Sequence, residues 1–198
     1  MVTDAIQKTY TSIPNKHFKV WTLRDILKVS KIKGMIILAK VIVFYFSATN
    51  TTKQRAEKVA QKLGADLFEI HAAKPYSVAD LDWHDPQSRT SIEQHQHASR
   101  VAIKDDLPDI SSYDTVLIGF PIWWGIPPRL IADLIDHLPL DGKQLAGFAT
   151  SGSSGFDRAQ SYLERTVKEN NAAVQVLPGA VLNNDAQMDA WLKQLNLN

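Results

Sequence analysis

The sequence of 198 residues contains no cysteine. The chain therefore cannot form a disulfide, a thiolate zinc site or an iron–sulfur cluster, and it has no thiol nucleophile. Any oxidation–reduction chemistry would need a bound cofactor. A lack of cysteine also fits a reducing compartment, so we expect a cytoplasmic protein.

Long apolar runs are also missing. The longest run, residues 34–46 ("GMIILAKVIVFYF"), is interrupted by Lys40 and is shorter than the roughly 20 residues needed to span a membrane. Lysines precede it as they do in a signal peptide, but cleavage after it would remove a strand that the rest of the chain needs. We therefore expect no transmembrane segment.

The net charge of the chain is small, +1 at pH 7, but it is unevenly distributed. Residues 1–39 carry seven basic and two acidic side chains, whereas residues 40–198 have a net charge of −4. This predicts a basic N-terminal extension followed by one domain over residues 40–198. The extension could form a basic amphipathic helix over residues 17–34, or it could be a mobile tail if translation begins at Met35. No nucleic-acid partner is expected.

Three familiar motifs are absent as well. The sequence has no G-x-x-x-x-G-K-[ST] loop, no G-x-G-x-x-G after its first predicted strand and no G-x-S-x-G. These absences argue against a nucleoside triphosphatase, a dinucleotide-binding domain and a serine hydrolase. Three histidines, His84, His95 and His97, do not share a helix face at metal-ligand spacing, so no metal site is predicted. No catalytic side chain is predicted either.

From Lys40 onward, β-branched and aromatic runs alternate with amphipathic stretches. This pattern predicts a doubly wound parallel sheet with helices on both faces. The predicted strands are residues 40–46, 66–70, 114–120, 143–150 and 173–182, the last interrupted at Pro178-Gly179. The predicted helices are residues 52–64, 127–138, 156–170 and a final helix that begins at Asp185, with one more near residues 91–103.

In such sheets ligands bind beyond the carboxyl ends of the strands, where the strand order reverses. The loops to consider are therefore residues 47–52, 121–127 and 151–155. The first loop, "SATNTT", offers hydroxyls at the start of a helix, where unpaired amides and the helix dipole attract a phosphate group. A single capping residue would explain part of this loop, but not five polar residues out of six.

The second loop, in "GFPIWWGIPPRL", contains adjacent tryptophans. Neighbouring side chains on an extended backbone point to opposite sides, so Trp123 and Trp124 cannot both face one core. One of them can lie against a planar ligand. The third loop, "SGSSG", is small and rich in hydrogen-bonding groups. Together the three loops predict a slot for a flat heteroaromatic ring with a phosphate tail, a description that fits FMN.

Five segments in this order carry a resemblance to the flavodoxin family: "FSATNTT", "PYSVADLDW", "SRTSIEQ", "GFPIWWGIPP" and "FATSGSSG". The resemblance covers about residues 40–195 and implies a five-stranded sheet of order 2-1-3-4-5, for which flavodoxin is a standard example. It also implies three sets of FMN-binding residues. These are Ser47, Thr49, Asn50, Thr51 and Thr52 at the phosphate, Pro121, Ile122, Trp123, Trp124 and Gly125 beside the isoalloxazine, and Thr150, Ser151, Gly152, Ser153 and Gly155 at its pyrimidine edge.

The resemblance leaves three functions open. The first is a low-potential electron carrier that docks with a reductase and with an acceptor protein. The second is an NAD(P)H-dependent quinone reductase, favoured somewhat because the predicted domain is only weakly acidic for a carrier. The third is a scaffold that binds no flavin. Trp83 could serve either as core or as a cover over the flavin, whereas Trp191 lies on an apolar helical stripe and is predicted to be core.

Overall fold

The computed structural model describes residues 40–96 and 98–197. The predicted basic extension, residues 1–39, and the amphipathic helix proposed within it lie outside the described residues, as does His97. Among the residues described, no helix is long and apolar enough to cross a membrane.

The centre of the domain is a parallel β-sheet with the strand order β2-β1-β3-β4-β5. Every neighbouring pair is parallel, and the flavodoxin-like order 2-1-3-4-5 is confirmed. The strands are β1 (Val41–Tyr45), β2 (Asp66–Glu69), β3 (Thr115–Pro121), β4 (Gln144–Thr150) and β5 (Gln175–Val176).

The last predicted strand is divided in two, as the Pro178-Gly179 pair suggested. β5 pairs with the start of β4, and β6 (Ala180–Val181) pairs with Phe148 and Ala149 further along the same strand. Gly179 lies in the interruption, where a Cβ atom would collide with the Phe156 ring and with the backbone oxygen of Gly147. The chain therefore passes β4 too closely here for any residue larger than glycine.

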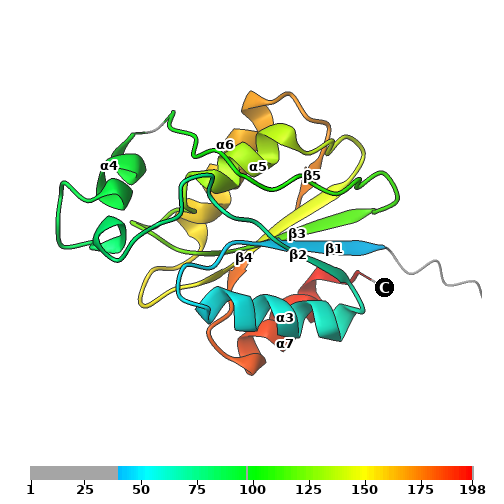
Figure 1. Ribbon diagram of the computed structural model, residues 1–198. Coiled ribbons are helices and arrows are strands. Elements are labelled where there is room, and N and C mark those ends of the chain that lie inside the picture. The colour runs from blue at the N-terminus through cyan, green and yellow to red at the C-terminus, as the bar shows by residue number, and fades with distance from the viewer. Residues whose placement is uncertain (1–39, 97, 198) are drawn as a thin grey trace, which may run out of the picture. The chain divides into compact units, whose positions relative to one another are not determined.

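Helices cover both faces of the sheet (Figure 1). α3 (Thr51–Leu63) and α7 (Asp185–Leu195) lie on one face, while α5 (Leu130–His137) and α6 (Asp157–Glu169) lie on the other. Alternate residues of β1 consequently join two different cores: Val43 packs in the α3 and α7 layer, and Phe44 in the α5 and α6 layer. Trp191 of α7 is buried, as predicted.

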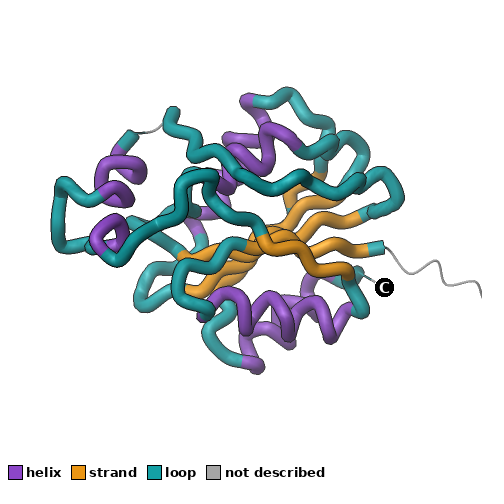
Figure 2. The backbone as a smooth tube through the Cα atoms, viewed as in Figure 1, coloured by secondary structure: helices purple, strands orange, loops and turns teal. Residues whose placement is uncertain are grey.

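The long connection from β2 to β3 is mostly loop (Figure 2). It contains a short 3-10 helix, η1 (Ala79–Leu81), and α4 (Arg89–His95), which lie beyond the carboxyl ends of the strands (Figure 1). The helix predicted over residues 91–103 is therefore placed too late and made too long. Ser88 caps α4 by accepting a hydrogen bond from the Ser91 amide. At the other end, the Arg129 guanidinium donates to the Glu93 and Gln94 carbonyls, which a longer helix would need for itself.

Candidate functional site

The first loop ends at an exposed helix N-terminus. Asn50 adopts a left-handed conformation (φ 63°) and its side chain does not cap α3. The first hydrogen bond of the helix runs from the Gln54 amide to the Asn50 carbonyl, so the amides of residues 51–53 precede the helical ladder. An uncapped N-terminus of this kind, with its positive dipole end, suits an anionic group.

Two hydroxyls at this loop are buried but have different partners. Ser47 Oγ is buried and has no hydrogen-bond partner within the described part of the chain. Thr52, by contrast, is 1% exposed, and its hydroxyl lies 2.8 Å from that of Thr150. The Thr52 hydroxyl therefore joins the first loop to the third, while Ser47 keeps an unused hydrogen-bonding group.

The second loop closes in a tight turn. The amides and carbonyls of Trp123 and Ile126 exchange two hydrogen bonds, of 3.0 and 3.1 Å. The two residues between Trp123 and Ile126 have positive φ angles, 51° for Trp124 and 83° for Gly125. Glycine adopts this conformation readily, but a bulky aromatic residue rarely does. Trp124 is thus held in a strained position, as is common at binding sites.

The two indoles lie in different surroundings. Trp123 packs edge-on against Phe46 and Tyr76, with ring centroids 5.7 and 5.4 Å away. Trp124 instead faces His95, at 6.3 Å. Both side chains stay partly exposed, because each also lines a cavity.

That cavity has a volume of about 430 Å³ and lies between the second and third loops. Its size is within the range of small-molecule sites. The long connection closes its remaining side with η1 and α4. The lining residues are Leu81, Trp83, Thr90, Ile122, Trp123, Trp124, Ser151, Gly152, Ser153 and Ser154. We call this space the indole cavity.

A hydrogen-bonded network fixes the wall behind Trp123. The Tyr76 hydroxyl donates to Glu93 at 2.7 Å, and Arg89 donates to the same carboxylate at 2.6 Å. Burial, together with this bond to Glu93, raises the pKa of Tyr76 well above its ordinary value, so the hydroxyl stays protonated. Gln94 adds a direct link, because its side-chain amide donates to the Trp123 carbonyl at 2.9 Å.

The structure brings only part of the predicted site together. Six predicted residues line the indole cavity: Ile122, Trp123, Trp124, Ser151, Gly152 and Ser153. Pro121 ends β3 opposite Thr150.

The predicted residues of the first loop do not line the indole cavity. Ser47 borders a small cavity of about 170 Å³, whereas Thr49 and Asn50 are exposed at the start of α3. Thr51 borders another cavity, of about 320 Å³, together with Thr150. Gly125 and Gly155 line a further cavity on the other side of Trp124.

Sequence reasoning missed several residues of the site. Leu81 and Thr90 line the indole cavity, and Gln94 holds its wall. These residues belong to the segments "PYSVADLDW" and "SRTSIEQ". The spacing within these segments does not indicate that the long connection folds back over the second loop. Trp83 is 67% exposed and lines the cavity, so the prediction that it belongs to the core is wrong.

Metal ligands are not gathered in the described ranges. Within residues 40–96 and 98–197, no group of three or more His, Cys, Asp or Glu side chains could hold a metal ion. His84 stacks on Trp83, with ring centroids 3.5 Å apart, and His95 Nδ1 lies 2.6 Å from the Ser91 carbonyl. These two rings therefore serve local packing and hydrogen bonding.

Comparison with known proteins agrees with this architecture. A family model described as "Flavodoxin" matches residues 40–195. A protein from Bacteroides eggerthii assigned as a flavoprotein is 40% identical, with a TM-score of 0.73, over 79% of this chain and 97% of its own. A similarly assigned protein from Bacteroides uniformis is 38% identical, with a TM-score of 0.71, over 78% and 98%.

A third similar structure contains a ligand. It is a flavoprotein from Lactobacillus acidophilus in complex with FMN, 25% identical, with a TM-score of 0.62, over 78% of this chain and 99% of its own. No curated protein matches the chain. Because the family model spans most of the chain, including all three loops and every strand of the sheet, the chain belongs to the flavodoxin family.

Proposed function

We propose that this protein binds FMN and carries electrons between a reductase and an acceptor protein. The observation that carries the proposal is the indole cavity, which places two tryptophans and the polar third loop at the carboxyl ends of β3 and β4. FMN is also the ligand of the Lactobacillus acidophilus flavoprotein to which the chain is similar. A ring with polar edges suits this lining, since indoles accept a flat apolar face and Ser151 to Ser154 offer hydrogen bonds.

The first loop fits the other end of the cofactor. An FMN phosphate needs hydrogen-bond donors, and the amides of residues 51–53 lie at the uncapped start of α3. Ser47 Oγ is buried without a partner among the described residues, so a phosphate oxygen would satisfy it. Asn50 adopts a left-handed conformation immediately before α3, and this conformation turns the chain from the loop into the helix.

When bound, FMN supplies the electron-transfer chemistry, and the protein tunes it. The chain's own residues have three tasks. The first loop binds the phosphate, and the strained turn at Trp124 and Gly125 shapes one wall of the cavity. Trp123, held by Gln94 and by Tyr76, offers its indole as a fixed apolar part of that wall. A preorganised, partly apolar environment of this kind changes the stability of a charged ring.

Partner proteins would approach at the rim of the indole cavity. Trp83 is 67% exposed, and two other apolar side chains of the same long connection, Val78 and Ile92, are 90% and 43% exposed. Of these three, Trp83 lines the indole cavity, and an exposed apolar side chain at a cofactor site suits a transient contact with a reductase or an acceptor. A cytoplasmic location stays a prediction.

A second candidate is an NAD(P)H-dependent quinone reductase. The observation that favours it is the net charge of residues 40–198, only −4. Carriers that dock onto basic partners gain speed from a strong opposite charge. A weakly charged domain gains little, whereas an enzyme acting on small molecules needs no such charge.

The first experiment is reconstitution. Apoprotein titrated with FMN should quench the flavin fluorescence at micromolar concentration, and riboflavin should bind at least about tenfold more weakly, because it lacks the phosphate. Equal affinity for the two would refute the role of the first loop. No binding of either would leave only the scaffold function.

The second experiment separates carrier from enzyme. The FMN-loaded protein is titrated without oxygen, first with dithionite and then with NADPH. A carrier should take up two electrons in resolved single steps from dithionite and should not oxidise NADPH directly. Rapid NADPH oxidation with turnover on a quinone would instead establish the reductase.

A further inference from the structure

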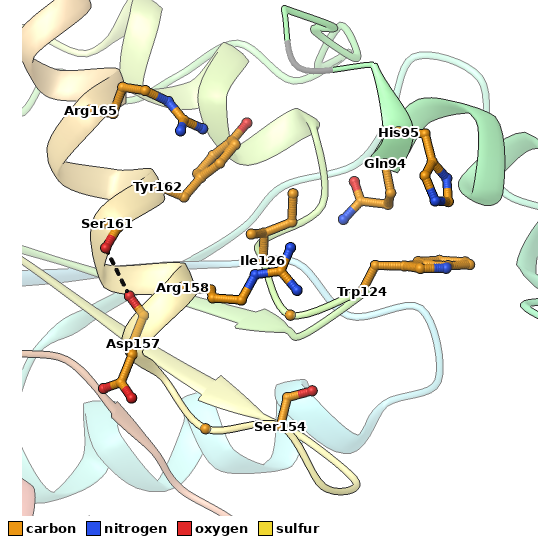
Figure 3. Close-up of a pocket in the computed structure, with 12 residues that line it drawn as sticks. Gln94, His95, Trp124, Ile126, Ser154, Asp157, Arg158, Ser161, Tyr162 and Arg165 are labelled. Carbon is orange, nitrogen blue, oxygen red and sulfur yellow. Dashed lines mark hydrogen bonds between the residues drawn. The ribbon is translucent and has the colours of Figure 1, made fainter.

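A second cavity lies on the opposite side of the second loop. Its volume is about 970 Å³, and it is formed by the end of α4, the turn at residues 124–126 and one face of α6 (Figure 3). It shares only Trp124 and Ser154 with the indole cavity. None of the residues of the first loop lines it. We call it the α6 cavity.

Two buried polar groups in the lining of the α6 cavity lack partners. Tyr162 is 2% exposed, and its hydroxyl has no hydrogen-bond partner within the described residues. Gln94 is 5% exposed; its Nε2 donates to the Trp123 and Pro127 carbonyls, while its Oε1 accepts nothing within the same residues. Buried polar groups are nearly always paired. Gln94 Oε1 therefore points to a ligand that carries a hydrogen-bond donor, and the Tyr162 hydroxyl, which can donate or accept, points to a second polar group on that ligand.

The charged side chains of the cavity are mainly basic. Arg158 and Arg165 lie seven residues apart on α6, which places them on one face of the helix, two turns from each other. Arg158 has no acidic partner within 4.0 Å in the described chain. The acidic contact of Arg165 is long, 3.8 Å to Glu169, and its guanidinium lies over the Tyr162 ring, 5.4 Å from the centroid. In Figure 3 the carboxylate of Asp157 points away from these guanidinium groups.

Arg158 lies close to Gly125. A Cβ at residue 125 would lie 2.7 Å from Nη1 of Arg158, so the guanidinium crosses directly over the glycine of the strained turn. Beside it, Trp124 and Ile126 offer an apolar surface (Figure 3). His95 completes the far side, and because its Nδ1 is engaged with the Ser91 carbonyl, its Nε2 is left to face a ligand.

We propose that the α6 cavity binds a small organic anion with a planar ring and a hydrogen-bond donor. The carboxylate or phosphate of the ligand pairs with Arg158 and Arg165, since guanidinium groups recognise both. The ring lies against Trp124 and Ile126. A hydroxyl or amide of the ligand donates to Gln94 Oε1. This site goes beyond the proposed function and does not require FMN to be bound.

The location gives such a ligand a role next to the flavin site. Trp124 and Ser154 line both cavities, so they form the boundary between them. A ligand in the α6 cavity would contact one side of the strained turn while the flavin site uses the other. Binding of the anion is therefore placed to change the affinity for FMN, because both ligands would contact the same turn.

The test measures binding by calorimetry on the full-length protein, with and without FMN. The probes are 4-hydroxybenzoate, its neutral amide 4-hydroxybenzamide, and NADPH, which carries phosphates, a planar ring and an amide. We expect 4-hydroxybenzoate or NADPH to bind at submillimolar concentration, and the neutral amide to bind at least about tenfold more weakly than the benzoate.

Variants assign the binding to this cavity. Arg158→Gln and Arg165→Gln should each weaken binding about tenfold, and Tyr162→Phe should weaken it severalfold. The matched control is Lys168→Gln, which removes a basic charge from the same helix but outside the cavity. Circular dichroism verifies that each variant is folded.

Three results would overturn the proposal. The first is that neither anion binds at about 5 mM, which is beyond the millimolar range of weak specific sites. The second is that 4-hydroxybenzoate and its amide bind equally well. The third is that Lys168→Gln weakens anion binding as much as the arginine variants do. FMN binding is followed separately by its absorption. Anion binding that persists in a protein unable to bind FMN would refute the proposed function alone.

Discussion

Thr52 and Thr150 are 98 residues apart in the sequence, yet their hydroxyls lie 2.8 Å apart and are buried. The first residue belongs to the start of α3 and the second to the end of β4. Their hydrogen bond therefore fastens the loop proposed to bind the phosphate to the loop proposed to border the ring. Each hydroxyl depends on the other for its pairing.

We expect Thr52→Val to lower the free energy of unfolding by about 1–3 kcal/mol, because it leaves the buried Thr150 hydroxyl unpaired. Urea denaturation of the apoprotein measures this. The double variant Thr52→Val/Thr150→Val should recover part of the loss, since no unpaired hydroxyl remains. Thr51→Val, at the exposed neighbouring position, should change stability by less than about 0.5 kcal/mol. A double variant as unstable as the sum of the single ones would contradict this explanation.

Ser47→Ala should separate stability from binding. The hydroxyl of Ser47 is buried without a partner, so its removal should leave the apoprotein equally stable or slightly more stable. The same change should lower FMN affinity about tenfold or more, because a hydrogen bond to a charged phosphate is worth about 1.5–3 kcal/mol. Fluorescence titration and urea denaturation give the two quantities. A fall in stability with unchanged FMN affinity would show that Ser47 is structural.

Gly179→Ala should destabilise the protein by about 1–3 kcal/mol, because the new methyl group would collide with the Gly147 backbone oxygen, which cannot rotate away. Gly155→Ala is the matched control. A Cβ there meets no atom within 4 Å, so we expect almost no change. Thermal unfolding of the two variants tests the difference, and equal midpoints would mean that the interruption between β5 and β6 tolerates a side chain.

Asp185 should contribute to the loss of stability in acid. A hydrogen bond from Lys58, and to a smaller extent one from Arg55, lowers the pKa of its carboxyl group in the folded protein. A lowered folded-state pKa means that the contribution is fully present above the unfolded value, about 3.9, and is lost as the pH falls through the folded value.

Asp185→Asn should therefore lower stability at pH 7 and make the protein less sensitive to acidification below about pH 4. Urea midpoints at neutral and acid pH measure this. Asp106→Asn, at an exposed position, should keep the acid sensitivity of the original protein. If the two variants respond to pH alike, the ion pairs of Asp185 contribute nothing measurable, as is common for exposed pairs.

The alternation of apolar runs and amphipathic stretches predicted every strand of the sheet to within a few residues. These runs are recognisable because a strand buried on both faces, such as β1, must be continuously apolar. The three loops were predictable for a related reason, since parallel strands bring their carboxyl ends to one edge. The Pro178-Gly179 interruption was readable because proline and glycine act locally on the backbone.

Local sequence did not predict α4 correctly. Its end is decided by Arg129, which comes from the start of α5 and takes the Glu93 and Gln94 carbonyls. The pattern of apolar residues within residues 91–103 cannot reveal this contact, because Arg129 lies outside that segment. The same holds for the wall of the indole cavity, where Gln94 and Tyr76 reach Trp123 from a distant part of the chain.

The amino-acid sequence by itself determined the strands, their loops and the membership of a flavin-associated family, because hydrophobic period and turn chemistry are local properties of the chain. Only the tertiary structure decided which hydroxyl is paired with Thr150, that Trp124 lines both cavities while Trp123 lines the indole cavity, and that Arg158 crosses over Gly125. These relationships join residues that are far apart in sequence, and the packing of the helices on the sheet alone brings their atoms within hydrogen-bonding or van der Waals distance.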